Sequence, residues 1–520
     1  MHTPRTRREF LSAVGQGMFV ATIGSSLATD LGLSRAFGEE PSEPLSFGSL
    51  EPLVVMMQET PVDRLLPVLV ERMGQGVPLD TLLSAAALAN ARTFGGEDYI
   101  GFHTMMALAP AMYMSRELPE ARRPLPIFKV LYRNTNRIQE FGGRASETLH
   151  KVEPMTPANA AAGQNLQALV HAKDVNQAER LLAGLVQKSP EDAFNDVLMV
   201  VEEHTEVHRV VMPYRSWDLM GLIGREHAHT LLRQSVRYCI QNESRAGNSE
   251  YDEPRVLLPK LLDQYHLADR AAGDQAADDA WVDQLSQTIF TGTPAQAAEA
   301  AAAALAEGFA PAAVGEAISL AANQLVLRDA GRTAQAESPG KPIGSVHGDS
   351  VGVHACDSAN AWRNMSRVAN PRNAFACLIM GAYQVARDRI NSRGDFLHWD
   401  PQPIARHLER LSATEPDALL KELDEAVRGN LQARATAITH RYGQLGHAPR
   451  GVFDLLLRYA ISEDGALHGE KYYRTVSEEF AATRPSFRWR QLTALARVTA
   501  SEYGRKAAGC DEAKELLKLA

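Results

Sequence analysis

The segment His347-Gly-Asp-Ser-Val-Gly-Val-His354 decides how this chain is interpreted, because its pattern occurs a second time far upstream. Asp98-Tyr-Ile-Gly-Phe-His103 has the same Asp-x-x-Gly-x-His spacing. In each copy a Met-Ser-Arg follows, and its serine, Ser115 or Ser366, lies twelve residues after the histidine. Two copies with one offset indicate a duplicated helical unit that carries a histidine.

The composition favours an all-α fold. Hydrophobic residues make up 45% of the 520 residues and aromatic residues only 7%, and alternation of β-branched residues is rare. Breaks at Pro78, Pro190 and Pro311 divide pairs of amphipathic segments, and a histidine-bearing segment follows each pair. The residues twelve positions after those prolines are all polar, which supports the register: Asn90, Glu202 and Asn323. The sequence predicts a large helical domain of about three pseudo-repeated units.

We expect five regions along the chain. They are a signal peptide at 1–38, a linker at 39–60, helical repeats one and two at 61–245, a third helical repeat with an inserted loop at 246–400, and a C-terminal helical region at 401–520. The inserted loop is rich in Gly, Ser, Pro and Lys, a composition typical of surface loops.

The N-terminus carries a targeting pattern. Thr6-Arg7-Arg8-Glu9-Phe10-Leu11 precedes an apolar segment from Ala13 to Ala28 and closely resembles a twin-arginine (Tat) export signal. This resemblance implies recognition by the Tat export machinery, export of a folded protein, and a periplasmic or extracellular location. After it the chain has no run of about 18 apolar residues, so we expect no stable membrane span after cleavage.

Charge and missing motifs exclude several functions. The net charge of −9 is spread along the chain, which argues against a nucleic-acid partner. The chain has no dinucleotide or P-loop glycine motif, no Gly-x-Ser-x-Gly and no His-Glu-x-x-His, so nucleotide-dependent transfer, serine hydrolysis and zincin proteolysis are not expected. Its four cysteines form no Cys-x-x-Cys, and spacing alone leaves a disulfide open.

Histidines are the candidate metal ligands. Equivalent positions of repeated units tend to meet near a common axis, so His103, His229 and His354 form a candidate three-histidine cluster. His208 lies four residues after His204 and could add a ligand from a second helix face. Imidazole suits iron, copper and zinc, so the expected cofactor is a divalent transition metal of this group.

Other residues near these histidines could move protons or add a ligand. Glu226-x-x-His229 places a carboxylate one helical turn before an imidazole, but di-metal helical bundles use two such motifs and only one is present. Glu226 or His227 is the candidate proton carrier. His468, two residues before Glu470, could supply a fourth ligand or a proton donor. The alternative is structural: each histidine bonds a neighbouring loop, and the repeated aspartate caps its helix.

The helical body, with spaced histidines in apolar segments, resembles the questin oxidase-like proteins, an all-helical group linked to oxidation of aromatic polyketides. That resemblance implies oxidation chemistry. The hypothesis from the sequence is an exported metal-dependent oxidoreductase, with an oxygenase among the options, acting on a small-molecule substrate. The alternative is a non-catalytic helical-repeat protein whose concave face binds a ligand or partner.

Overall fold

The computed structural model describes residues 43–156, 161–243, 249–391 and 394–519. The expected export signal at 1–38 lies outside the described residues. Residues Ser46–Ala520 form one compact unit, which contains all the expected helical regions. The all-α prediction is confirmed. Among the described residues, no helix is both long and apolar enough to cross a membrane.

Helices make up nearly all of the regular structure. The α-helices are α2 (Glu51–Glu59), α3 (Val62–Gly74), α4 (Leu79–Phe94), α5 (Tyr99–Arg116), α6 (Pro124–Phe141), α7 (Ala162–His171), α8 (Val175–Lys188), α9 (Pro190–Val201), α10 (Val207–Ile223), α11 (Ala228–Asn242), α12 (Ser249–Gln264), α13 (Asp279–Thr291), α14 (Pro294–Ala306), α15 (Pro311–Arg328), α16 (Val351–Val368), α17 (Pro371–Asp388), α18 (Ala405–Leu408), α19 (Pro416–Arg428), α20 (Gln432–Gln444), α21 (Arg450–Ser462), α22 (His468–Ala482), α23 (Trp489–Glu502) and α24 (Cys510–Leu516).

Short elements connect these helices. The 3-10 helices are η2 (Gly48–Leu50), η3 (Glu120–Arg122), η4 (Gly143–Ser146), η5 (Arg225–His227), η7 (Ala334–Ala336) and η8 (Phe396–His398). Strands β1 (Ile390–Asn391) and β2 (Gly394–Asp395) pair antiparallel. Helix α2 lies in the stretch expected as a linker and packs on α4, so part of that stretch belongs to the compact unit.

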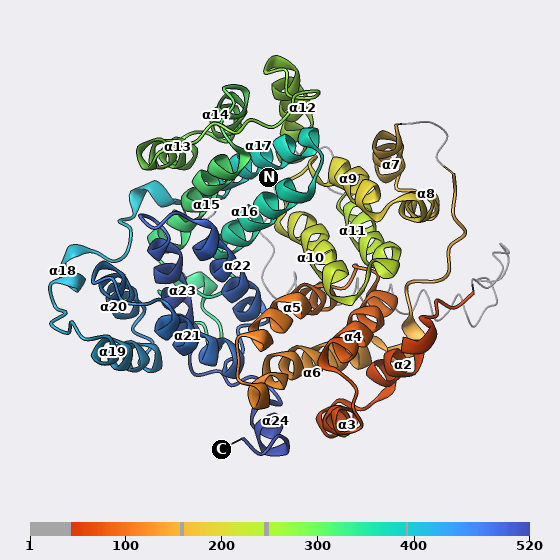
Figure 1. Cartoon of the computed structure of the whole chain (residues 1–520), viewed down its shortest axis with the longest axis horizontal. Coiled ribbons are helices and arrows are strands. Elements are labelled where there is room, and N and C mark those ends of the chain that lie inside the picture. The colour runs from red at the N-terminus through yellow and green to blue at the C-terminus, as the bar shows by residue number, and fades with distance from the viewer. Residues whose placement is uncertain (1–42, 157–160, 244–248, 392–393, 520) are drawn as a thin grey trace, which may run out of the picture. The chain divides into compact units, whose positions relative to one another are not determined.

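Four helices form an inner ring. Helix α5 contacts α10, α10 contacts α16, α16 contacts α22, and α22 contacts α5. Figure 1 shows these four helices around the middle of the view, although they come from widely separated parts of the chain. They carry His103, His208, His354 and His468 respectively. The ring therefore brings one histidine from each quarter of the fold toward a shared interior.

Each inner helix is flanked by the helices before and after it in sequence. The flanking pairs in contact with it are α4 and α6, α9 and α11, α15 and α17, and α21 and α23. Pro78 caps α4, and Pro190 and Pro311 begin α9 and α15, so the three proline breaks mark three of these units. The fourth unit comes from the C-terminal region, which closes the ring.

Capping residues determine where the inner helices begin. The Asp98 carboxylate accepts a hydrogen bond from the Gly101 N–H and starts α5, and Ser350 caps α16 in the same way. Glu206 accepts backbone N–H groups at the start of α10. Each of these caps lies within five residues before a histidine, so His103, His208 and His354 all belong to the first two turns of their helices.

Buried amides join the inner and outer helices. The Asn90 side chain on α4 is fully buried, and its Nδ2 lies 2.8 Å from the Gly101 carbonyl oxygen, 2.8 Å from Thr104 Oγ1 and 2.7 Å from Asn134 Oδ1. One amide therefore ties α4 to both α5 and α6. The four cysteines are also buried, and none forms a disulfide.

We expect Asn90→Ala to lower the free energy of unfolding by about 1–3 kcal/mol, because it leaves buried polar atoms of α5 and α6 without their partner. Asn136→Ala on α6 is the matched control, since the Asn136 amide bonds only the exposed Glu140 carboxylate, and it should cost less than about 0.5 kcal/mol. Urea unfolding followed by circular dichroism measures both. Equal losses in the two variants would contradict the structural role of Asn90.

Candidate metal centre

Four imidazoles meet inside the inner ring. Their ring centroids form a closed circuit, with 4.8 Å between His103 and His208, 6.1 Å between His208 and His354, 5.1 Å between His354 and His468, and 5.2 Å between His468 and His103. Two pairs of Nε2 atoms lie closest: those of His103 and His208 are 3.3 Å apart, and those of His354 and His468 are 3.1 Å apart.

The tautomers of one pair follow from its neighbours. His103 Nδ1 lies 2.6 Å from the Tyr99 carbonyl oxygen, and His208 Nδ1 lies 2.7 Å from Glu206 Oε1. A carbonyl and a carboxylate can only accept, so each Nδ1 carries a proton, and when both rings are neutral each Nε2 presents a lone pair. The two lone pairs face each other across 3.3 Å. This arrangement is repulsive unless a cation lies between the nitrogens.

Glu206 is held in its ionised form. Burial by itself would raise the pKa of this carboxyl, but the hydrogen bond and charge of His208 and bonds from the Arg209 N–H and the Tyr238 hydroxyl lower the pKa to about 2. The carboxylate therefore fixes the ring orientation and tautomer of His208, as partners of metal-bound histidines do.

The spacing of the nitrogens suits a metal ion. Tetrahedral ligands about 2.0–2.1 Å from a zinc ion lie about 3.3 Å from each other, and the two close Nε2 pairs are 3.3 and 3.1 Å apart. In the described chain, only His171, Glu203 and Glu243 form a group of three with all ligand atoms within 4.8 Å. The four cluster histidines therefore form two close pairs and contain no compact triad. Ligands about 2.0–2.1 Å from one ion lie at most about 4.2 Å apart, and no three imidazoles of the quartet come within 4.8 Å of one another, so the arrangement matches one ion per pair.

Three imidazoles of the cluster, those of His103, His354 and His468, are kept neutral. Burial, followed by the positive charge of Lys471, holds the pKa of His103 and of His468 well below its usual value and lowers the pKa of His354 to about 3. Neutral imidazole is the form that binds metals. Lys471 is itself 3% exposed, and the charges of Asp357 and Glu470 act on it.

One imidazole of the cluster, that of His354, is partly exposed. His103, His208 and His468 are 4%, 8% and 4% exposed, whereas His354 keeps more accessible surface. The Tyr99 side chain is 60% exposed, and its ring centroid lies 4.5 Å from that of His103.

The structure brings His103, His208 and His354 together and places the remaining candidates elsewhere. His229 Nε2 lies 3.3 Å from the Glu179 carbonyl oxygen, and His229 and Glu226 line a separate pocket beside α8. Glu226 is exposed on η5, and His227 packs its ring 6.3 Å from that of Phe47. The second repeat therefore contributes His208 instead of His229 to the inner ring.

His468 completes the cluster and was only a secondary candidate in the sequence. Its unit lacks the Asp-x-x-Gly-x-His pattern, because α22 begins at His468 itself after Leu467, which has a left-handed φ of 67°. The sequence signal that could have identified His468 is the order helix, loop, histidine, which all four units share. It is weak, because the loops before the histidines differ in length.

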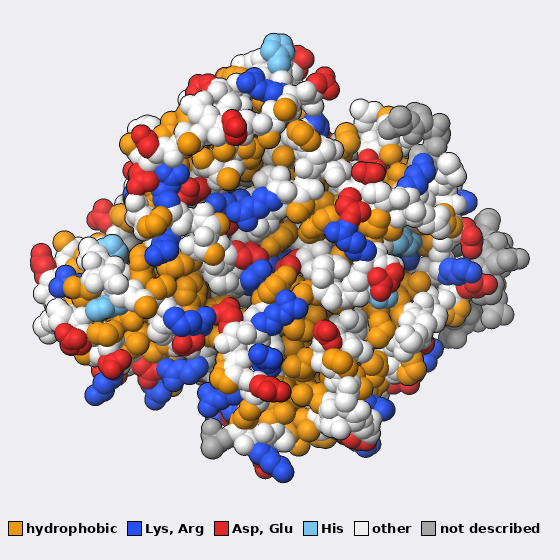
Figure 2. Space-filling model, viewed as in Figure 1, with side chains coloured by type: hydrophobic (Ala, Val, Ile, Leu, Met, Phe, Trp, Pro, Cys, Tyr) orange, Lys and Arg blue, Asp and Glu red, His pale blue; other side chains and the backbone are white. Residues whose placement is uncertain are grey.

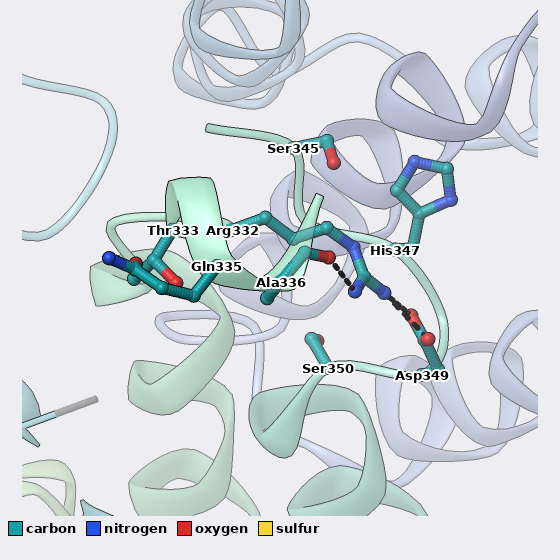
Figure 3. Close-up of a pocket in the computed structure, with 8 residues that line it drawn as sticks. All are labelled: Arg332, Thr333, Gln335, Ala336, Ser345, His347, Asp349 and Ser350. Carbon is teal, nitrogen blue, oxygen red and sulfur yellow. Dashed lines mark hydrogen bonds and ion pairs between the residues drawn. The ribbon is translucent and has the colours of Figure 1, made fainter. Parts of the chain in front are cut away.

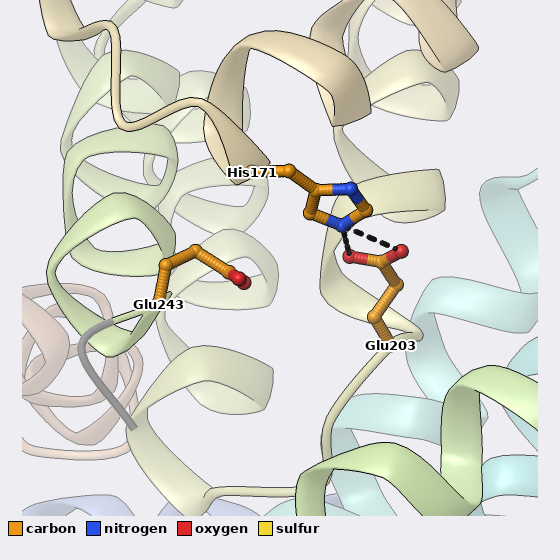
Figure 4. Close-up of side chains that lie close together, drawn as sticks. All are labelled: His171, Glu203 and Glu243. Carbon is orange, nitrogen blue, oxygen red and sulfur yellow. Dashed lines mark hydrogen bonds and ion pairs between the residues drawn. The ribbon is translucent and has the colours of Figure 1, made fainter. Parts of the chain in front are cut away.

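A second group of possible ligands lies outside the ring. Figure 4 shows the His171 imidazole facing the Glu203 carboxylate, with Glu243 across from both. His171 Nε2 lies 2.8 Å from Glu203 Oε2. Guanidinium groups of Arg209 and Arg255 lie within 3.7 Å of both carboxylates. Since these cations already compensate the acids, the triad has little need of a metal ion.

Comparison with protein families, with curated proteins and with solved structures found no match for this chain. The arguments for its function therefore rest on the geometry of the histidine cluster and on its surroundings.

A buried hydrogen bond holds the loop that passes next to the histidine cluster. The Gly348 N–H donates to Glu502 Oε1 at 2.8 Å. A Cβ at Gly348 would lie 2.3 Å from His468 Cβ, so only glycine allows the loop to pass this close to the imidazole. Burial raises the pKa of Glu502 to about 7.

This pKa predicts a dependence of stability on pH. The folded protein binds the Glu502 proton more tightly than the unfolded chain, so the contribution of Glu502 to stability is complete below pH 4.5 and is lost as the pH rises to about 7. In metal-free protein, the stability of wild type relative to Glu502→Gln should fall by on the order of 2 kcal/mol between pH 5 and pH 7.5. Urea unfolding at both pH values tests this, and a constant difference would contradict it.

Proposed function

We propose that this protein is an exported metal-dependent oxidoreductase whose centre is held by His103, His208, His354 and His468. The observation that carries the proposal is the pair of Nε2 lone pairs of His103 and His208, which face each other inside the ring. Buried polar atoms normally have a partner, and a transition metal ion supplies one to both nitrogens.

The donor set supports a redox-capable metal. Four imidazole nitrogens with no thiolate or carboxylate among them suit copper and iron as well as zinc. A bound copper or iron ion would supply one-electron chemistry. His354 is the partly exposed member of the cluster, so a small-molecule substrate or an oxidant would reach the centre from its side.

Residues of the chain have separate roles in this proposal. Tyr99 and Glu206 fix the tautomers and orientations of His103 and His208. Lys471 places a buried positive charge beside the cluster, which favours an anionic ligand or transition state there. Glu226 and His227 lie in a different region. We therefore assign proton transfer at the centre to Lys471 and not to Glu226 or His227.

The N-terminal export signal fits a protein that contains a metal centre. The N-terminal resemblance to a twin-arginine signal supports export by the Tat machinery after folding and metal loading, and a periplasmic or extracellular location. Figure 2 shows acidic and basic side chains intermixed over one face of the protein, a pattern that suits no extended polyanion. The proposed partner at the centre is a small molecule.

The decisive test is the metal content and redox behaviour of single-histidine variants. Full-length protein exported by its own host and measured by elemental analysis should hold copper or iron in stoichiometric amount. His103→Ala and His354→Ala should each lower metal affinity more than about 100-fold, because loss of an outer partner alone costs about 10- to 100-fold. Absorption and electron paramagnetic resonance spectra should change reversibly with ascorbate and ferricyanide.

His229→Ala is the matched control, since His229 is a partly buried imidazole bonded to a backbone carbonyl, and it should keep the full metal content. Metal-free wild type of normal stability would contradict the proposal and favour a non-catalytic helical-repeat binding protein, with a shared proton between His103 and His208. Zinc alone, with no redox response, would contradict the proposed oxidoreductase activity but would still support a metal site.

A further inference from the structure

A pocket with basic and apolar walls lies between α18 and α20. It has a volume of about 550 Å³, within the range of about 300–1,000 Å³ typical of small-molecule sites. One wall comes from α18 and the residues after it, and the other from the turn between α19 and α20 and the first turn of α20; Figure 1 shows these three helices together at the left of the view. The lining residues in the described chain, none of them acidic, are His407, Arg410, Leu411, Asn430, Leu431, Gln432, Ala433 and Arg434.

Two guanidinium groups of this pocket are accessible to a ligand. Arg410 is exposed, and its side chain has no ion pair or hydrogen bond to another described residue. The Arg434 side chain is 48% exposed, and of its nitrogens only Nη2 has a partner, Glu422 Oε2 at 3.2 Å. Burial, followed by the charges of Arg406 and Arg410, lowers the pKa of His407. The pocket therefore carries positive charge that the chain itself does not neutralise.

The start of α20 adds backbone donors to the arginines. Leu431 is the N-cap residue and has no side-chain acceptor, and the first turn contains no acidic residue. Within the described chain, the N–H groups of Ala433 and Arg434 have no backbone acceptor. Uncapped N–H groups and the helix dipole favour an anion at this end of a helix, so the backbone and the side chains of the pocket select the same charge.

Hydrogen bonds fix the wall formed by the α19–α20 turn. Asn430 has a left-handed φ of 52°, and its Nδ2 donates to the carbonyl oxygens of Ala500 and Tyr503 at 3.0 and 2.8 Å. Gln432 Nε2 donates to the Gly344 carbonyl oxygen. The turn is therefore tied to two neighbouring segments, and a ligand has little of it to order on binding.

The pocket beside η7 lacks accessible groups of this kind. Figure 3 shows the Arg332 guanidinium bonded to the Ala336 carbonyl oxygen and to Asp349. Lys341 pairs with the same carboxylate at 2.7 Å. Since the cations of that pocket are already bonded within the chain, the pocket between α18 and α20 is the stronger candidate for binding an anion.

Two leucines give the pocket between α18 and α20 an apolar part. Leu411 packs against the core, and Leu431 is 49% exposed. We propose that this pocket binds a carboxylate with an aliphatic chain, of the fatty-acid type. Arg410 and Arg434 donate to the carboxylate oxygens, and the chain lies on Leu411 and Leu431. A carboxylate matches the planar fork of a guanidinium, and the volume leaves room for an aliphatic body. The proposal does not depend on the metal centre.

Calorimetric titration of the full-length protein tests the site. The probes are octanoate, octanol as its uncharged counterpart, acetate as the carboxylate without a chain, and inorganic phosphate. Octanoate should bind, and the other three should bind at least about tenfold more weakly, because each lacks either the charge or the apolar body. Arg410→Gln should weaken octanoate binding at least about tenfold, since hydrogen bonds to charged groups are strong.

Leu431→Asp should abolish octanoate binding without destabilising the fold. The backbone at Leu431, with φ −86° and ψ 66°, is close to that of Asp174, with φ −87° and ψ 85°, whose carboxylate caps α8. An aspartate at position 431 would cap α20 in the same way and repel the ligand. Thermal unfolding should give a Tm equal to or above that of wild type.

Arg64→Gln is the matched control, since Arg64 is an exposed arginine on α3 whose side chain also has no partner among the described residues. Octanoate binding should not change in it. The proposal is overturned if octanoate does not bind, if octanol or phosphate binds as tightly, or if Arg410→Gln and Leu431→Asp bind like wild type. Binding to vesicles of an anionic phospholipid without binding to octanoate would also overturn it and indicate a membrane-facing surface.

Discussion

The structure depends on two imidazole nitrogens that face each other with their lone pairs. His103 and His208 each have Nδ1 bonded to an acceptor, so neither can turn its ring to donate from Nε2 without breaking that bond. Two acceptors held 3.3 Å apart in a buried place repel each other, and a proton or a metal ion between them relieves this repulsion. The helices that enforce this contact are therefore organised around an ion or a proton.

The inner ring explains how distant segments reach one point. Each inner helix begins next to its histidine, through an Asp98, Glu206 or Ser350 cap or, for α22, through a left-handed Leu467. Flanking helices on both sides then fix the direction of each inner helix. The start of each helix and its packing against the flanking helices together set the geometry of the cluster.

The sequence predicts the helices well and the cluster in part. Apolar periodicity and proline breaks are local, so the all-α fold follows from them, and the repeated Asp-x-x-Gly-x-His motif identifies His103 and His354. The choice between His208 and His229 depends on which helix of the second unit faces inward, and that is decided by packing against α5 and α16. His468 follows a loop of different design, so no local pattern connects it with the other three.

The loop from Ser345 to Ser350 lies between the histidine cluster and a polar pocket. Its backbone is held by Glu502 and passes against His468, while its side chains His347 and Asp349 line a polar pocket. A Cβ at Gly348 would push the loop away from His468 and widen the distance between pocket and cluster. Glycine is therefore required at position 348, and the loop places a polar pocket one helical turn from His354. Proximity of this kind is what a centre needs in order to act on a bound molecule and not on solvent.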